Sequence, residues 1–346
     1  MKKLLNTLFV TSDDAYLSRE GETVVVSRNR EVALRVPIHT LEGIILLSHS
    51  SLSTPLMGFC AEHRVQISCV SGRGEFYARL QGPVAGNVLL RRAQYRAADE
   101  PSQCAEASYA FVGAKVANCR TVLLRAIRDL TDIRSRVEPA CDGLARTLET
   151  LQARHAAGTL TVDAVRGLEG DAAQQYFAVF DALIKAEKPA FSFTGRSRRP
   201  PLDRINALLS FVYTLLMHDI VGALESVGLD PYVGFLHTDR PGRPGLALDL
   251  MEEMRPVLAD RLVLTLINRK QVGANDFEIQ PNGAVLMNQS ARRTVLQQWQ
   301  ARKQEEVTHP FLGEAVALGL FPYVQALLLS RWLRGDLDAY PALVWR

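Results

Sequence analysis

The hydrophobic period of the sequence changes once, within residues 81–86, and this change constrains the fold more than any other feature. Up to residue 82, short segments rich in β-branched residues alternate apolar and polar positions, as β-strands do. After the glycine- and proline-containing segment QGPVAG the period becomes helical for most of the chain. We therefore predict an α+β protein: a small N-terminal β-strand domain at 1–85, then a larger, mainly α-helical domain at 86–346.

The same patterns predict the individual elements. In the first domain we expect strands within 5–11, 15–19, 22–27, 31–37, 43–48, 65–70 and 75–80, with one helix at 54–63. In the second we expect helices at 87–98, 102–130, 145–157, about 161–187, 202–227, from 246 onward, and near 290–304 and 311–334. A hairpin is expected at 276–288, where Pro281, Asn282 and Gly283 form the turn.

Composition restricts the class of protein. With 346 residues of which 47% are apolar, the chain can bury a large core, and its formal charge of +3 means that any basic surface must be local. The five cysteines are odd in number and show no C-x-x-C spacing, which favours reduced thiols. The apolar run 207–217 is shorter than the roughly 20 residues that a spanning helix needs. We expect a soluble, cytoplasmic protein with no membrane partner.

One histidine and several carboxylates are gathered in residues 229–256, LDPYVGFLHTDRPGRPGLALDLMEEMRP. The helix predicted at 202–227 should end at Gly228, which places His237 in the irregular segment that follows. Beyond it, Asp249, Glu252 and Glu253 share one side of a helix at spacings i, i+3 and i+4. Three carboxylates so close together repel one another unless a cation offsets them, although such triplets are usually solvated.

A second carboxylate lies where an apolar residue is expected. Glu169 is in helical register with Ala173, Tyr176 and Phe180, and an unpaired carboxylate on such a stripe would cost several kcal/mol. Its partner is therefore a metal, an arginine or a hydrogen-bonding network, and Arg166, one turn earlier, is a candidate. Repulsion among these acids should raise the pKa of at least one of them.

Two basic segments flank the histidine. They are either solvated loops or phosphate-binding segments, and their arginines are Arg196, Arg198, Arg199 and Arg204 before His237, and Arg240 and Arg243 after it. Together with the carboxylates, the histidine supplies the oxygen and nitrogen ligands that suit Mn²⁺ or Mg²⁺. No P-loop, GxGxxG, HExxH or GxSxG motif is present, so the sequence indicates no organic cofactor site.

Four stretches, GLEGDAAQQYF, FSFTGRSRRPPLDRINALLSFVYTLL, GLDPYVGFLHTDRPGRPGLALDLMEEMRP and VLTLINR, resemble the CRISPR-associated endonuclease/integrase of spacer acquisition, the family numbered one among CRISPR-associated proteins. The resemblance runs over essentially the whole chain. It implies a metal-dependent enzyme whose ligands in this sequence are Glu169, His237 and Glu252, with Asp249 as the competing third ligand. It also implies Mn²⁺ or Mg²⁺, double-stranded DNA, a homodimer formed in part by the β-domain, and a small ferredoxin-like partner.

For such a protein we expect insertion of new spacers into a CRISPR array, by attack of a protospacer 3′-hydroxyl on repeat phosphodiesters. Two other classes stay open on the residues alone. One is a metal-dependent phosphohydrolase acting on small phosphate esters, which would show little salt dependence with long DNA. The other is a non-catalytic DNA-holding subunit whose carboxylates only form ion pairs with basic residues.

Overall fold

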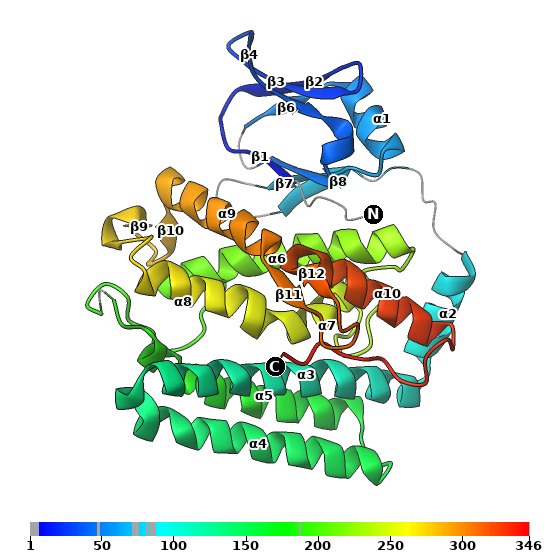
Figure 1. Ribbon diagram of the computed structural model, residues 1–346, viewed down its shortest axis with the longest axis vertical. Coiled ribbons are helices and arrows are strands. Elements are labelled where there is room, and N and C mark those ends of the chain that lie inside the picture. The colour runs from blue at the N-terminus through cyan, green and yellow to red at the C-terminus, as the bar shows by residue number, and fades with distance from the viewer. Residues whose placement is uncertain are drawn as a thin grey trace. The chain divides into compact units, whose positions relative to one another are not determined.

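The computed structural model describes residues 7–46, 49–70, 76–80, 82, 88–186 and 188–345 (Figure 1). The chain forms two compact units. The first comprises Met1–Ala85, Leu296–Glu305 and Leu318–Leu320, and the second comprises Gly86–Val295, Glu306–Ala317 and Phe321–Arg346. The sequence placed a boundary at residue 85 but did not assign the two later segments to the first unit.

The N-terminal part of the first unit, within the residues that the structure describes, contains two four-stranded sheets and the helix α1. One sheet has the order β4-β3-β2-β6 and the other β1-β5-β7-β8. Its elements are β1 (Thr7–Val10), β2 (Ala15–Glu20), β3 (Thr23–Arg28), β4 (Glu31–Pro37), β5 (Gly43–Leu46), β6 (Ser51–Leu52), α1 (Thr54–Glu62), β7 (Gln66–Val70) and β8 (Phe76–Leu80). Alternate residues such as Leu17, Val24 and Val26 turn into one core with Leu56 and Phe59 of α1. The alternating pattern is thus confirmed, and only the two-residue β6 was too short to predict.

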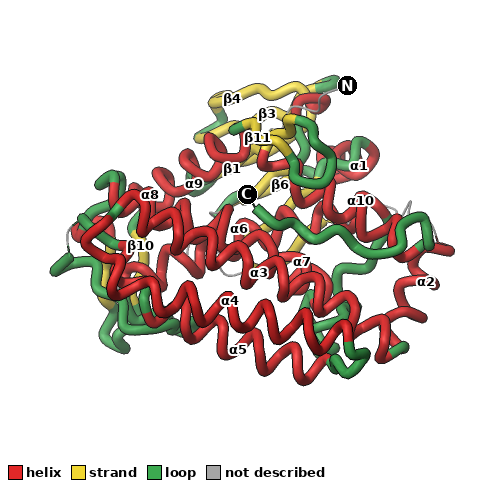
Figure 2. The backbone as a smooth tube through the Cα atoms, turned by 60° about the horizontal axis from the view of Figure 1, so that its bottom comes forward, coloured by secondary structure: helices red, strands yellow, loops and turns green. Residues whose placement is uncertain are grey.

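The second unit is mainly helical. Its elements are α2 (Val88–Asp99), α3 (Pro101–Asp129), α4 (Arg134–Ala156), α5 (Val162–Ala178), α6 (Arg204–Val227), α7 (Gly245–Met254), a π-helical segment (Arg255–Asp260), α8 (Arg261–Asn268), the hairpin β9 (Phe277–Ile279) and β10 (Val285–Met287), α9 (Gln289–Gln304, which crosses the unit boundary), the hairpin β11 (Glu306–Thr308) and β12 (Ala315–Ala317), and α10 (Phe321–Leu333). Figure 2 shows α3, α4 and α5 side by side as one layer, as Figure 1 does. Within this layer, α3 carries Lys115 and α5 carries Glu169, two charged residues of the site described below.

Three predicted helix boundaries are wrong for identifiable reasons. The helix predicted at 145–157 begins at Arg134 and runs through Pro139, a residue that usually kinks or breaks a helix and so hides the helical pattern in the sequence. The helix predicted at 311–334 begins at Phe321, since Glu306–Thr308 and Ala315–Ala317 pair as a hairpin whose Gly313 has a φ of 69°. The helix predicted to about 187 ends at Ala178 and continues only as a 3₁₀ turn.

Helix α6 is the apolar helix that leads to the site. The Asp203 carboxylate accepts a hydrogen bond from Asn206 N at 2.7 Å at its start, and Gly228 ends it with a φ of 90°. By length and composition α6 would suffice to span a membrane, with a mean hydropathy of 1.7 over its most apolar window. Because 67% of that window is buried inside the protein, α6 has the character of a core helix.

The C-terminal segment is fastened to α3 and α7 by one buried amide. Asn118 Nδ2 donates to the backbone oxygens of Glu253 and Leu343, both at 2.7 Å, and Asn118 Oδ1 accepts from Trp345 N at 2.7 Å. The Asn118 side chain is fully buried, so these bonds are sheltered from water. A single side chain therefore joins three segments, and the residues that it joins are at least 90 positions apart in sequence.

We expect Asn118→Ala to lower the free energy of unfolding by about 3 kcal/mol, because it leaves two buried carbonyls and one amide without partners. Urea unfolding measures the change. Thr150→Ala is the matched control, since the half-buried Thr150 on α4 donates a hydrogen bond within its own helix, to Arg146 O, and its loss should cost at most about 0.5 kcal/mol. Equal effects of the two substitutions would contradict this role for Asn118.

Candidate active site

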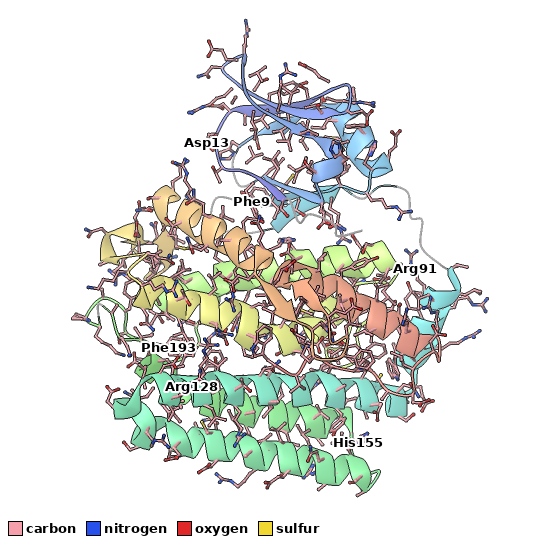
Figure 3. The ribbon with its side chains drawn as sticks, in the orientation of Figure 1. Phe9, Asp13, Arg91, Arg128, His155 and Phe193 are labelled. Atoms are coloured by element: carbon pink, nitrogen blue, oxygen red, sulfur yellow. The ribbon has the colours of Figure 1, made fainter. Side chains whose placement is uncertain are left out.

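The loop between α6 and α7 is held from its start. Arg91 Nε of α2 donates to Gly228 O at 3.2 Å, and Figure 3 labels this arginine on α2. The fully buried Gln94 donates to the backbone oxygens of Asp230 and Val233, at 2.7 and 2.9 Å, and accepts from Asp230 N at 2.9 Å. The loop thus leaves α6 in a fixed direction.

Two glycines allow the loop to lie directly against the start of α7. A Cβ atom at Gly234 would lie 2.7 Å from Asp249 Oδ2 and from Gly245 C, and one at Gly245 would lie 2.8 Å from Tyr232 O. Any larger residue at either position would have to push the backbone away. This close approach brings the peptide groups of residues 235–237 within reach of the Asp249 carboxylate.

Donors of the loop occupy both carboxylate oxygens of Asp249. Its Oδ2 accepts from Phe235 N at 2.6 Å and from Leu236 N at 3.0 Å, and its Oδ1 accepts from His237 N at 2.9 Å and lies 2.6 Å from His237 Nδ1. A carboxylate accepts from Nδ1 only when that nitrogen carries the proton, so Nε2 is left for another ligand. Asp249 is fully buried, and its two oxygens have four donors.

Glu169 and Glu252 meet at one ammonium group. Lys115 on α3 contacts Glu169 Oε1 on α5 and lies 2.6 Å from Glu252 Oε2 on α7, while Arg255 Nη1 lies 2.9 Å from Glu252 Oε1. Arg166, the partner considered from sequence, pairs with Asp163 at 2.7 Å instead. Its Nε and Nη2 donate to Leu236 O at 2.8 and 2.7 Å, which ties α5 to the loop next to His237.

The three acids of α7 therefore do not share one cation. Glu252 contacts Lys115 and Arg255, Asp249 binds the loop, and Glu253 accepts from Tyr340 Oη and Leu343 N, both at 2.6 Å. Burial raises the pKa of Glu253 to about 7. For Glu252, burial acts to raise the pKa, but Arg255 and Lys115 outweigh it and lower the pKa to about 2. The pKa predicted to be raised in at least one of the clustered acids is therefore not that of Glu252.

The side chains of this site include possible ligands for a divalent cation. Among the residues that the structure describes, no three His, Cys, Asp or Glu side chains form a metal-binding group, and Lys115 stands between the two glutamates. Glu252 Oε2 is nevertheless buried, and the Lys115 ammonium at 2.6 Å occupies the position where a cation would lie. Glu169 and Glu252 already contact one cation, the Lys115 ammonium, and His237 has its Nε2 available as a ligand. These oxygen and nitrogen atoms are of the kind that Mn²⁺ or Mg²⁺ binds.

A π-helical segment follows α7 directly and begins three residues after Glu252. Pro256 has no amide hydrogen to donate to the oxygen of Glu252, four residues earlier, so the helix widens over Arg255–Asp260. The widened turn brings Asp260 Oδ1 to 2.6 Å from Tyr213 Oη and Oδ2 to 3.1 Å from Tyr176 Oη. The guanidinium of Arg255 lies 5.2 Å from the centre of the Tyr213 ring, a cation–π contact next to Glu252.

The predicted phosphate-binding arginines separate into two groups. Arg196 is largely enclosed, donates to Asn206 Oδ1 and lies 5.3 Å from the Tyr213 ring, and Arg204 Nη1 donates to Ala190 O at 3.0 Å. Arg198, Arg199 and Arg240 are exposed, and Arg243 is half-buried. Only the second group leaves its charge to the solvent.

Comparison with known proteins gives the family. The model of the family described as "CRISPR associated protein Cas1" matches residues 8–301. The chain is 52% identical to a CRISPR-associated endonuclease Cas1 of Chlorobaculum tepidum and 51% identical to one of Rhodospirillum rubrum, over all of each chain. This chain belongs to the Cas1 family. The resemblance seen in the sequence is thereby confirmed.

Solved structures agree with the Cas1 fold. A casposase bound to an integration product has a TM-score of 0.83 at 22% identity and covers all of this chain and 95% of its own. A Cas1 protein of Thermotoga maritima has a TM-score of 0.81 at 20% identity and covers 97% of this chain and 98% of its own. A Cas6-RT-Cas1–Cas2 complex has a TM-score of 0.81 at 22% identity and covers all of this chain and 36% of its own. The predicted order, β-strands followed by helices, is confirmed.

Two charged residues of this Cas1 site were missed in the sequence. Lys115 lies on the buried stripe of α3, four residues from Phe111 and four from Cys119. The argument that singled out Glu169 applies equally to a lysine on such a stripe, so the signal was present. Arg255 follows Glu252 by three residues, the spacing of an ion pair on a helix.

We expect Asp260→Asn to stabilise the protein at pH 8 and not at pH 4.5. Burial raises the pKa of Asp260 to about 6, against hydrogen bonds from Tyr213 and Tyr176 and the charges of Arg196 and Arg255. A raised folded-state pKa contributes stability below pH 4 that is lost as the pH rises through 6. The substitution should therefore gain up to about 3 kcal/mol at pH 8.

Chemical unfolding at the two pH values measures this difference. The exposed Asp171→Asn on α5 is the control, with no change of effect between the two values. A gain from Asp260→Asn that is the same at pH 4.5 and pH 8 would contradict the assignment.

Proposed function

We propose that this chain is a metal-dependent DNA endonuclease/integrase that inserts new spacers into a CRISPR array. The observation that carries the proposal is that Glu169 of α5 and Glu252 of α7 contact the same cationic group, the ammonium of Lys115. The loop that presents His237 is tied to the same two helices, by Arg166 of α5 and Asp249 of α7. The names of the relatives, CRISPR-associated endonucleases, support the same reaction class.

In this proposal Glu169, His237 and Glu252 hold Mn²⁺ or Mg²⁺, which when bound stabilises charge on the attacking and leaving oxygens of a phosphodiester. Asp249 keeps the proton of His237 on Nδ1, so that Nε2 presents its lone pair. Arg255 lies beside Glu252 and keeps that carboxylate ionised. Arg198, Arg199 and Arg240 bind phosphates of the DNA strand, a contact independent of base sequence.

Glu252 is the better third ligand, and Asp249 supports the histidine. Both Asp249 oxygens are occupied by donors of the loop, and releasing them would free three backbone amides at once. Glu252 instead contacts the Lys115 ammonium at 2.6 Å and the Arg255 guanidinium at 2.9 Å, which belong to long side chains and not to the backbone. A metal can therefore take Glu252 at a much smaller structural cost.

We also propose double-stranded DNA, a second copy of this chain and a small ferredoxin-like CRISPR-associated subunit as partners. Two structurally similar proteins are described as bound to an integration product and as part of a complex with Cas2. In the homodimer the β-domain takes part in self-association. Sedimentation of the full chain as a monomer at micromolar concentration would contradict the dimer.

The ion pairs also favour a second candidate. Lys115 and Arg255 already neutralise the two glutamates, as a non-catalytic DNA-holding subunit would require. Strand transfer of labelled protospacer duplexes into repeat-bearing DNA with Mn²⁺, with and without the partner subunit, separates the two. Integration products support the enzyme, and DNA binding without products under both conditions supports the holding subunit.

We expect Glu169→Gln, His237→Ala and Glu252→Gln each to lower strand transfer at least about 100-fold and to reduce the rise in melting temperature that Mn²⁺ gives the wild type. A ligand at a hundredfold excess over its Kd adds about 2.7 kcal/mol to stability. Thermal melts with Mn²⁺ and with EDTA, beside the transfer assay, measure both effects. Full activity in all three variants would contradict the proposed metal site.

Asp249→Asn serves as the comparison in the same experiment. An amide cannot accept from all four donors without turning its own hydrogens toward a backbone amide, so this variant should melt lower even in EDTA. If Glu252→Gln retained activity and the Mn²⁺ response while Asp249→Asn lost both without a change in the EDTA melt, Asp249 would be the ligand.

We expect the double variant Arg198→Ala, Arg199→Ala to bind duplex DNA with a flatter dependence of log K on log salt, by about 2 units. Each phosphate contact releases about 0.9 counterion from B-DNA. Filter binding between about 50 and 200 mM salt gives the slope. The control is Arg125→Ala, Arg128→Ala on α3, where Asp129 already pairs with both arginines. An unchanged slope in the first variant would make the cluster a solvated loop.

A further inference from the structure

The Lys115 ammonium is enclosed by the two proposed metal ligands. Lys115 is 7% exposed and Glu252 2% exposed, and the ammonium contacts Glu169 and Glu252 together. Lys115 comes from α3, a different helix from either glutamate, so none of these contacts follows from neighbourhood in sequence. A buried ammonium needs such partners, because leaving it unpaired costs several kcal/mol.

The group is neutral without a metal. Two carboxylates, Glu169 and Glu252, face two cations, Lys115 and Arg255. A divalent cation added between the same carboxylates would bring the group to a charge of +2 in a water-poor setting. Binding a metal there therefore requires the ammonium to withdraw from at least one carboxylate.

The position of the ammonium is fixed by the fold. Asn118, one turn along α3 from Lys115, bonds to the oxygen of Glu253, the residue next to Glu252. This bond sets the register of α3 against α7, and the Leu343 and Trp345 contacts of the same amide lock it. The lysine is thus held opposite Glu252 by buried hydrogen bonds.

We propose that Lys115 is a positioning residue that keeps the two metal-binding carboxylates together when no metal is bound, and that a divalent cation displaces it. This inference rests on the metal site of the proposed function. Lys115 and the metal compete for the same oxygens, so the lysine lowers metal affinity while it stabilises the metal-free protein. A lysine with a purely structural role would make metal binding weaker, not stronger, when removed.

The test compares wild type with Lys115→Met and Lys115→Gln in the full-length protein. Calorimetric titration with Mn²⁺ alone should show about tenfold tighter binding or more in both variants, since a competing charge is gone. Their melting temperatures in EDTA should fall by about 5 °C, because the buried carboxylate of Glu252 and the half-buried carboxylate of Glu169 lose a partner. Their Mn²⁺-induced rise in melting temperature should exceed that of the wild type. Lys115→Gln keeps a polar group at the site and remains informative should Lys115→Met fail to fold.

Two controls isolate the cause. Lys115→Arg retains the charge and should not tighten Mn²⁺ binding. Lys188→Met removes a lysine that lies 2.7 Å from Asp181 in the same unit and should leave Mn²⁺ affinity unchanged. Unchanged or weaker Mn²⁺ binding in both neutral Lys115 variants, while the wild type binds the ion, overturns this inference alone. Absence of Mn²⁺ binding in wild type and variants alike overturns the metal site as well.

Discussion

The burial of three carboxylates on α7 is the constraint on which the rest of the structure depends. Asp249, Glu252 and Glu253 are all at most 2% exposed within a ten-residue helix. Burying one unpaired charge costs several kcal/mol, so each acid needs partners of its own. Three sets of contacts supply them: the loop at 235–237 for Asp249, Lys115 and Arg255 for Glu252, and the C-terminal segment for Glu253. The helical unit is organised by these three sets of contacts.

The same contacts link the fold to the site chemistry. Asp249 sets the protonated nitrogen of His237 while it holds the loop, so one carboxylate has a structural and a chemical effect. The hydrogen bond of Asn118 to the Glu253 backbone fixes the distance between the helices that carry Lys115 and Glu252. The widened turn after Glu252 directs Asp260 toward two tyrosines and Arg255 toward Glu252. π-helical turns of this kind often occur at functional sites.

The sequence predicted those features of the fold that depend on residues close together in the chain. Alternation predicted the strands of the first unit, and Gly228 ends α6, as the preference for glycine after a helix suggested. The partners of the buried acids could not be predicted in this way, since Lys115 is 54 residues from Glu169 and Leu343 is 90 residues from Glu253. Arg166 was the natural partner for Glu169 by spacing, yet tertiary contacts direct it to Leu236. A charged residue on an apolar stripe shows that a partner exists but not which one.

Stability alone does not account for the four charges around Lys115. Replacing a buried ion pair by apolar side chains of similar volume is often neutral or stabilising, whereas removing one member costs about 3–5 kcal/mol. A set of carboxylates and cations in a core therefore persists most readily when some of its members have a second partner to bind. Glu252 is the clearest case, because its buried Oε2 faces the Lys115 ammonium at 2.6 Å, in the position that a divalent cation would take. The ion pairs hold the carboxylates in place, and a bound cation would replace the ammonium between them.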